Sequence, residues 1–228
     1  MKVTTTIFAH GRAIETVKRH YPIWKKNSDN ILIISPVDDP CILDNIDCLT
    51  NSNSQKYGYD ALKRQLFGLK SALSYDSDYY VFLEYDAIML QRPQSRPMIQ
   101  GNLFNDYIFF NRLTEPMSQG FCFLHFPWIF PSNILKFFTE SVEVKEDDYP
   151  VTDGWMPQKI MDLNLEIHNT YYGEAYSQNT IEPKHFDELS MAIQNGAYAI
   201  HGIKEQETLD IVMQSFNKSN NINDEYQR

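Results

Sequence analysis

The sequence alternates short apolar segments with segments in which apolar residues recur every three or four positions. Segments of the first kind, at residues 3–9, 31–34 and 79–83, predict buried β-strands. Segments of the second kind lie between them and predict two amphipathic helices. The order strand, helix, strand, helix, strand is typical of an α/β fold with parallel strands and right-handed crossovers. The helical stripes consist of Ile14, Val17, Tyr21 and Trp24, and of Leu62, Leu66, Leu69 and Leu73.

The second half of the chain has a less regular pattern. It predicts further strands and helices, but no internal repeat that would indicate a solenoid or a propeller. From residue 217 onward the residues are too polar to pack, which predicts a flexible tail over 217–228. The predicted strands are 107–110, 121–126 and 197–200, and the predicted helices are 131–140, 155–165 and 185–194, followed by a C-terminal helix.

The composition is that of a folded, acidic chain. Of its 228 residues, 43% are hydrophobic and 22% are charged, and the formal net charge at pH 7 is −10. Phosphate backbones and anionic lipids attract clustered Lys and Arg, so a protein that binds nucleic acid or a membrane surface is disfavoured. No segment approaches the roughly 20 apolar residues that cross a bilayer, and residues 3–9 do not resemble a signal peptide. Three cysteines without paired spacing fit a reducing compartment, and together these features predict a cytoplasmic protein.

Two carboxylates follow the apolar strand predicted at 79–83. Glu84 and Asp86 come at its carboxyl end, which is where open α/β sheets bind their ligands. Residues two apart on an extended chain point the same way, so both carboxylates can face one crevice. Among apolar neighbours the two charges repel each other unless a cation lies between them. The pair therefore predicts a site for Mg²⁺ or Mn²⁺, and the alternative is a solvated strand end with a helix-capping role.

His201 is the candidate for a third ligand of this ion. It directly follows the predicted strand 197–200 and precedes Gly202, so an imidazole at a second strand end can complete the ion's shell. The alternative is a hydrogen-bonded surface histidine. The acidic pair alone is a weak signal, because two acidic residues separated by one position occur four times in the chain. Among these pairs, Glu84 and Asp86 follow a predicted buried strand.

The residues around this pair resemble those of the GT-A fold glycosyltransferases, which bind nucleotide-sugar donors on a divalent ion held by a DXD motif. The resemblance rests on the segments 57–65 and 78–86, a helix start and then an apolar strand that ends in the acidic pair. It implies a single GT-A-like domain over 1–216, with a mostly parallel central sheet flanked by helices and a smaller mixed or antiparallel portion. Residues 1–100 would form the nucleotide-binding half, and 101–216 the acceptor and catalytic half.

The resemblance also implies roles for individual residues. Asp86 would bind the ion directly, and Glu84, which stands where the family has an Asp, would reach the ribose or a metal-bound water. Segments 9–12, 118–121 and 152–155 are similar to the family's base-binding loop, glycine loop and catalytic segment. The resemblance thus assigns donor contacts to Ala9, His10, Arg12, Asp38, Arg64, Glu84 and Gly120, metal contacts to Asp86, Glu84 and His201, and the catalytic carboxylate to Asp153.

The function implied is metal-dependent transfer of a sugar from a nucleotide-diphosphate sugar to a hydroxyl of a glycan or protein. Asp38, as a reader of the uracil edge, favours a UDP-sugar. If the reaction inverts the anomeric configuration, which the resemblance slightly favours, Asp153 is the general base; if it retains it, Asp153 binds hydroxyls. A capping Asp at the start of a helix is the alternative for this residue. The alternative functions are a sugar-phosphate nucleotidyltransferase and a non-catalytic module that binds carbohydrate or nucleotide.

Overall fold

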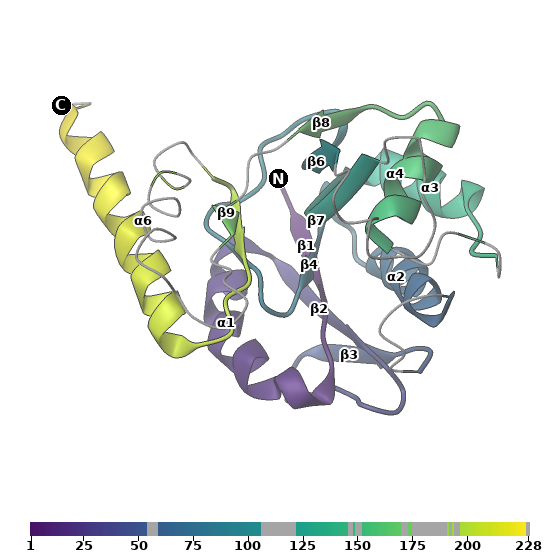
Figure 1. The fold of residues 1–228 in the computed structure, drawn as a ribbon, viewed down its shortest axis with the longest axis horizontal. Coiled ribbons are helices and arrows are strands. Elements are labelled where there is room, and N and C mark those ends of the chain that lie inside the picture. The colour runs from purple at the N-terminus through teal and green to yellow at the C-terminus, as the bar shows by residue number, and fades with distance from the viewer. Residues whose placement is uncertain are drawn as a thin grey trace.

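The computed structural model of the chain describes residues 1–53, 59–105, 122–145, 148, 152–169, 173–174, 191, 193 and 197–226. A seven-stranded sheet with the order β3-β2-β1-β4-β7-β6-β8 forms its centre, and a three-stranded sheet with the order β5-β10-β9 lies beside it (Figure 1). The large sheet consists of β1 (Val3–Phe8), β2 (Asn30–Ser35), β3 (Asp47–Thr50), β4 (Tyr79–Glu84), β6 (Ile99–Asn105), β7 (Cys122–Pro131) and β8 (Ile167–Asn169). The small sheet consists of β5 (Ile88–Met89), β9 (Gly173–Glu174) and β10 (Ala199–His201).

Helices cover both faces of the large sheet. In Figure 1, α1 lies on one side of it, and α2, α3 and α4 lie on the other. The long helix α6 lies beside the small sheet, and its C-terminal part extends away from the rest of the molecule. The helices are the short 3₁₀ helix η1 (Gly11–Ala13), α1 (Ile14–Asn27), α2 (Tyr59–Ala72), α3 (Ser132–Ser141), α4 (Thr152–Asp162) and α6 (Gln206–Tyr226).

The predicted α/β fold is confirmed. β1 pairs in parallel with both β2 and β4, and β2 pairs in parallel with β3. β4 and β6 then pair antiparallel with β7, which gives the sheet its antiparallel portion. The order β3-β2-β1-β4 is the arrangement of a Rossmann-like half-sheet, whose strands all end at one edge. We call this edge, which is formed by the segments that follow β1, β2 and β4, the carboxyl edge.

β4 shows why these residues form a central strand. Alternate side chains of an extended chain face opposite sides, and here both sides are apolar. Val81 and Leu83 pack with Val17 and Trp24 of α1, whereas Tyr80 and Phe82 pack on the face that α2, α3 and α4 cover. A strand buried on both faces has no solvent side, which explains its unbroken apolar sequence.

Most predicted elements exist, with shifted bounds. β7 is longer than the strand predicted at 121–126, and α4 begins at Thr152, so Asp153 lies inside the first helical turn instead of preceding it. β3, β5, β6, β8 and β9 were not predicted. The strand predicted at 107–110 and the helix at 185–194, apart from residues 191 and 193, lie outside the described residues.

The C-terminal segment is helical as far as Tyr226. α6 thus includes residues 217–226, and the flexibility that we expect of this segment stays a prediction. The physical reason for the helix is local: the segment contains no Gly or Pro, and a helix that is already nucleated by packed residues propagates through polar ones. The packed residues are Leu209 and Val212, which contact the small sheet. Within the described ranges, no helix combines the length and apolar character needed to span a membrane.

Candidate metal and nucleotide site

Three side chains of α1 hold the segment that carries the acidic pair. They lie three and four residues apart, on one face of the helix, and each bonds to a main-chain carbonyl of the segment that follows β4. The three carbonyls belong to alternate residues, and all of them face α1. A buried carbonyl without a partner is costly, so these bonds fix the course of the chain. The three contacts are His20 Nδ1 to Tyr85 O (3.0 Å), Trp24 Nε1 to Ala87 O (2.8 Å) and Asn27 Nδ2 to Met89 O (2.8 Å).

His20 is held in one tautomer by this arrangement. Its Nδ1 faces a carbonyl, which only accepts, so Nδ1 carries the proton and Nε2 is the basic nitrogen. The side chain is fully buried, and among the described residues Nε2 has no hydrogen-bond partner. Burial lowers the pKa of His20 to about 4, although the bond to the carbonyl of Tyr85 opposes the shift. His20 is therefore a neutral support at pH 7.

The acidic pair lies in a tight turn at the carboxyl edge. Tyr85 N donates to Phe8 O (3.0 Å), which extends the pairing of β4 with β1 by one residue, and Ala87 N donates to Glu84 O (3.0 Å), which closes the turn. Glu84 remains 46% exposed, whereas the side chain of Asp86 is only 6% exposed. The turn thus presents one half-exposed and one buried carboxylate.

The small sheet brings His201 to this turn. β10 pairs antiparallel with β5, and Ile200 lies opposite Ile88, so the next residue, His201, comes close to the turn that precedes β5. The pairing continues through a bond from Ile203 N to Asp86 O of 2.8 Å. Residues 117 positions apart in the chain therefore meet at the carboxyl edge.

Glu84, Asp86 and His201 form a cluster of potential metal ligands. His201 Nε2 lies 3.0 Å from Glu84 Oε2 and 3.2 Å from Asp86 Oδ1, and one ligand atom from each residue lies within 4.8 Å of the others. An octahedral ion with bonds of about 2.1 Å separates neighbouring ligand atoms by about 3.0 Å, so the two distances from His201 Nε2 fit Mg²⁺ or Mn²⁺. Asp86 Oδ1 is buried and accepts no well-directed hydrogen bond within the described part of the chain. The three side chains could accept an ion with little rearrangement.

The charges around Asp86 keep this buried carboxylate ionised. Burial alone would raise its pKa, but the nearby imidazole of His201 and the charge of Lys204 more than offset burial and lower the pKa below its usual value. The ammonium nitrogen of Lys204 lies 3.6 Å from Asp86 Oδ2. Both oxygens of Asp86 thus face a cationic or proton-bearing group.

The predicted base-binding loop lies at the same edge, beside the acidic turn. Ala9 N donates to Ile34 O (3.0 Å), and the ring of His10 packs with its edge toward Tyr85, with 4.9 Å between the ring centres. The side chain of Arg12 is largely exposed, and its Nε donates to Asp39 Oδ2 at 3.0 Å.

Asp39 organises this loop. Its carboxylate also lies 3.8 Å from His10 Nδ1, and its main-chain oxygen accepts a hydrogen bond from Gly11 N (2.8 Å). A Cβ on Gly11 would lie 2.5 Å from Asp39 Oδ1 and 2.8 Å from Pro40 O, so this close approach requires a glycine.

Asp38 and Arg64 also lie near each other on this side of the molecule. Arg64 Nη1 donates to Asn53 O at 2.7 Å. Burial lowers the pKa of the Arg64 guanidinium, and the charges of Asp38 and Asp60 oppose that shift. The side chain of Asp38 is exposed, and its assigned contact with the nucleotide stays a prediction.

Two predicted site residues are not placed by the structure. Gly120 lies outside the described residues, and of Asp153 only the main chain, in the first turn of α4, is described. Their assigned roles stay predictions.

Sequence reasoning missed Asp39, Lys204 and the three supporting side chains of α1. Asp39 is adjacent to Asp38, and sequence alone gives no means of deciding which of two neighbouring carboxylates turns toward the loop. Lys204 follows His201 by three positions, and its proximity to a predicted site residue was the available signal. His20 lies three residues after Val17 and four before Trp24, so it shares their face of the helix, and a polar residue on a buried face indicates a buried polar contact.

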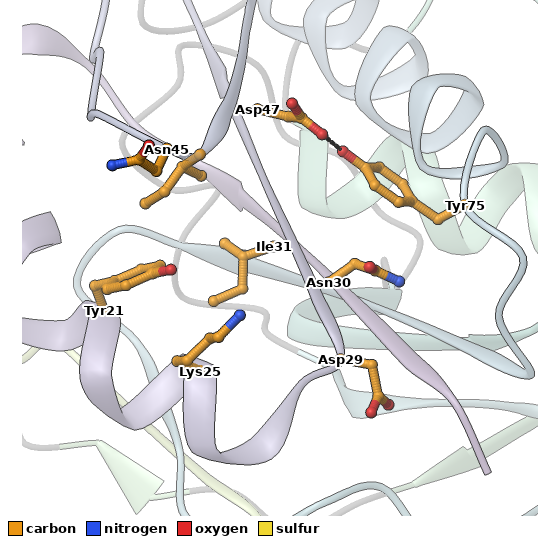
Figure 2. A pocket seen from close by; sticks show the side chains of 9 residues that line it. Tyr21, Lys25, Asp29, Asn30, Ile31, Asn45, Asp47 and Tyr75 are labelled. Carbon is orange, nitrogen blue, oxygen red and sulfur yellow. Dashed lines mark hydrogen bonds between the residues drawn. The ribbon is translucent and has the colours of Figure 1, made fainter.

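A described pocket of about 150 Å³ lies at the opposite edge of the sheet, where β2 and β3 begin (Figure 2). It contains two carboxylates, and both have fixed partners: Asp47 accepts a hydrogen bond from Tyr75, and Asp29 pairs with Arg92 at 3.1 Å. The lining residues are Tyr21, Lys25, Asp29, Asn30, Ile31, Asn45, Ile46, Asp47 and Tyr75.

The sheet order and the cluster at its carboxyl edge define a Rossmann-like α/β domain with a candidate site for a divalent cation. No protein-family model matches the sequence, and no protein of curated function matches it significantly. Among solved structures, the chain is similar to 2-C-methyl-D-erythritol 4-phosphate cytidylyltransferase from Thermus thermophilus. The TM-score is 0.45 at 12% identity, over 84% of this chain and 99% of that one.

Proposed function

We propose that the protein is a metal-dependent glycosyltransferase that uses a nucleotide-diphosphate sugar, with UDP favoured as the nucleotide. One observation carries the proposal: Glu84, Asp86 and His201 converge with the spacing of octahedral ligands at the carboxyl edge of a Rossmann-like sheet. This edge is where α/β sheets bind nucleotides. The resemblance to the GT-A glycosyltransferases supports the choice of a sugar donor.

In the proposed reaction, an acceptor hydroxyl attacks the anomeric carbon of the donor sugar. The bond from that carbon to the diphosphate oxygen breaks, and the nucleoside diphosphate leaves. A bound Mn²⁺ or Mg²⁺ supplies Lewis-acid neutralisation of the charge that develops on the diphosphate. Glu84, Asp86 and His201 would hold this ion, and the loop of His10 and Arg12, braced by Asp39, would receive the nucleotide.

The experiment that tests the proposal measures the products formed with Mn²⁺ and a panel of nucleotide sugars. Slow release of UDP or GDP, with water in place of the acceptor, is the expected result. Release of pyrophosphate from a sugar phosphate and a nucleoside triphosphate would instead identify a nucleotidyltransferase. Binding of nucleotide sugars without turnover would identify a non-catalytic module.

Asp153 is the proposed general base for an inverting transfer, on the strength of the resemblance. We expect Asp153→Asn to lower turnover by about a hundredfold or more, since an amide cannot take the acceptor's proton. The affinity for UDP, measured by calorimetry, should stay within about twofold of the unaltered protein, because the base does not bind the nucleotide. A large loss of UDP affinity would contradict the catalytic assignment and indicate a binding role.

A further inference from the structure

Lys204 lies against the candidate cation site without belonging to its ligand set. Its ammonium nitrogen is 3.6 Å from Asp86 Oδ2, while His201 Nε2 is 3.2 Å from the other oxygen, Oδ1. The Asp86 side chain is 6% exposed and that of Lys204 is 49% exposed. A half-solvated ammonium thus pairs with a buried carboxylate.

The main chain of Lys204 is fixed, although its side chain is long. Its carbonyl accepts hydrogen bonds from Arg19 Nη1 (2.5 Å) and Thr16 Oγ1 (3.5 Å), both on α1. The preceding residue, Ile203, is fully buried, and its amide donates to Asp86 O at 2.8 Å. The flexible part of Lys204 is therefore the four-carbon stem that carries the charge.

Two electrostatic facts bear on this ammonium. A buried carboxylate is costly unless a positive charge lies beside it, and Lys204 supplies that charge when no metal ion does. A divalent ion bound to the same carboxylate would lie within a few ångströms of the ammonium, and like charges at that distance repel strongly. An ion in such a site takes its remaining ligands from phosphate oxygens, which would offer the displaced ammonium a new partner.

We infer that Lys204 is a resident counter-cation: it pairs with Asp86 in the ion-free protein, opposes binding of the ion alone, and turns to the diphosphate when ion and nucleotide bind together. The last of these steps rests on the proposed function, whereas the first two concern the ion alone. The consequence is cooperative binding of ion and nucleoside diphosphate.

The test measures Mn²⁺ affinity by electron paramagnetic resonance, with and without saturating UDP. Without UDP, we expect Lys204→Met to bind Mn²⁺ about tenfold more tightly than the unaltered protein, because the repulsion is gone. The factor by which UDP tightens Mn²⁺ binding should fall about tenfold in this variant. By linkage, the factor by which Mn²⁺ tightens UDP binding should fall equally, which gives an internal check.

Two matched variants serve as controls. Lys204→Arg keeps the charge and should bind Mn²⁺ as the unaltered protein does. Lys26→Met removes an exposed charge from the last turn of α1 and should also leave Mn²⁺ affinity unchanged. Circular dichroism during heating would verify that Lys204→Met folds, as the main-chain anchors of this residue predict.

Equal or weaker Mn²⁺ binding by Lys204→Met would overturn the inference, as would an equal gain in Lys26→Met, or no binding of Mn²⁺ to either the unaltered protein or Lys204→Met. Failure of the proposed function gives a different result. In that case no donor releases a nucleoside diphosphate, while Lys204→Met still binds Mn²⁺ more tightly than the unaltered protein, and this supports the counter-cation role.

Discussion

The two edges of the large sheet each carry a pair of carboxylates, but they use them differently. At the carboxyl edge, Glu84 and Asp86 converge on one imidazole nitrogen at 3.0 and 3.2 Å. At the opposite edge, shown in Figure 2, Asp47 bonds to Tyr75 and Asp29 to Arg92, so each carboxylate has a partner of its own.

Burial and support separate the two edges further. Asp47 is exposed and Asp29 is 40% exposed, whereas the side chain of Asp86 is 6% exposed and the turn around it is held by three side chains of α1. Exposed carboxylates are well solvated and need no ion. A pair of acidic residues therefore becomes a candidate cation site when the fold makes the two carboxylates converge and buries one of them.

The largest effect that would sharpen this comparison is expected from Asp86→Asn. The amide keeps the size of the carboxylate but loses the charge that an ion requires. Substitution of a residue that only supports a metal ligand lowers metal affinity by about ten- to a hundredfold. Loss of a direct ligand should therefore weaken Mn²⁺ binding by more than about a hundredfold. Calorimetric titration measures this, and Mn²⁺ affinity within about threefold of normal would remove Asp86 from the ligand set.

An intermediate effect, on the free energy of unfolding, is expected from His20, which supports the carboxyl edge. The folded-state pKa of His20 is about 4, below its ordinary value of 6.5, so between these values the unfolded chain binds a proton that the folded chain does not. The free energy of unfolding should therefore fall by up to about 3 kcal/mol as pH decreases from 6.5 to 4, and this contribution should not change further below pH 4.

The measurement is urea unfolding between pH 7 and pH 4 for the unaltered protein and for His20→Gln. The glutamine side chain can still donate to the carbonyl of Tyr85 but does not titrate, so His20→Gln should show the shallower dependence on pH. Parallel curves for the two proteins would show that His20 takes no part in the pH dependence of stability.

The smallest effect is expected at the opposite edge, from Asp47→Asn. This exposed carboxylate loses its charge but keeps an oxygen that accepts from Tyr75, so the free energy of unfolding should change by less than about 1 kcal/mol. Mn²⁺ affinity should be unchanged, which makes this variant the matched control for Asp86→Asn. If Asp47→Asn impaired Mn²⁺ binding as strongly, the distinction between the two edges would be wrong.

The strands that sequence predicted well are those with two buried faces. β1, β2 and β4 have nearly continuous apolar or small residues because helices cover both sides of them. β3 was missed because it is the outermost strand of the sheet and its residues are mostly exposed. β6 was missed because Gly101 and Asn102 interrupt its apolar pattern. β5 and β9 have two residues each, too few for any periodicity.

Sequence predicted those residues of the candidate site whose place depends only on where a strand ends. Glu84, Asp86 and His201 come at the ends of apolar strands, and apolar strands can be recognised in the sequence. The supporting contacts were not predictable, because each depends on which way a side chain turns. Asp39, and not Asp38, braces the loop at Gly11. This depends on how closely two loops approach each other, which the sequence does not give.

The antiparallel pairing of β5 with β10 has a consequence for biosynthesis. It brings His201 to Glu84, 117 positions earlier in the chain. The ribosome has therefore synthesised every strand of the large sheet before it adds His201. A nascent polypeptide can therefore fold its Rossmann-like part before it has all three residues of the proposed ion site. On the proposed function, retention of Mn²⁺ would report that synthesis has passed His201.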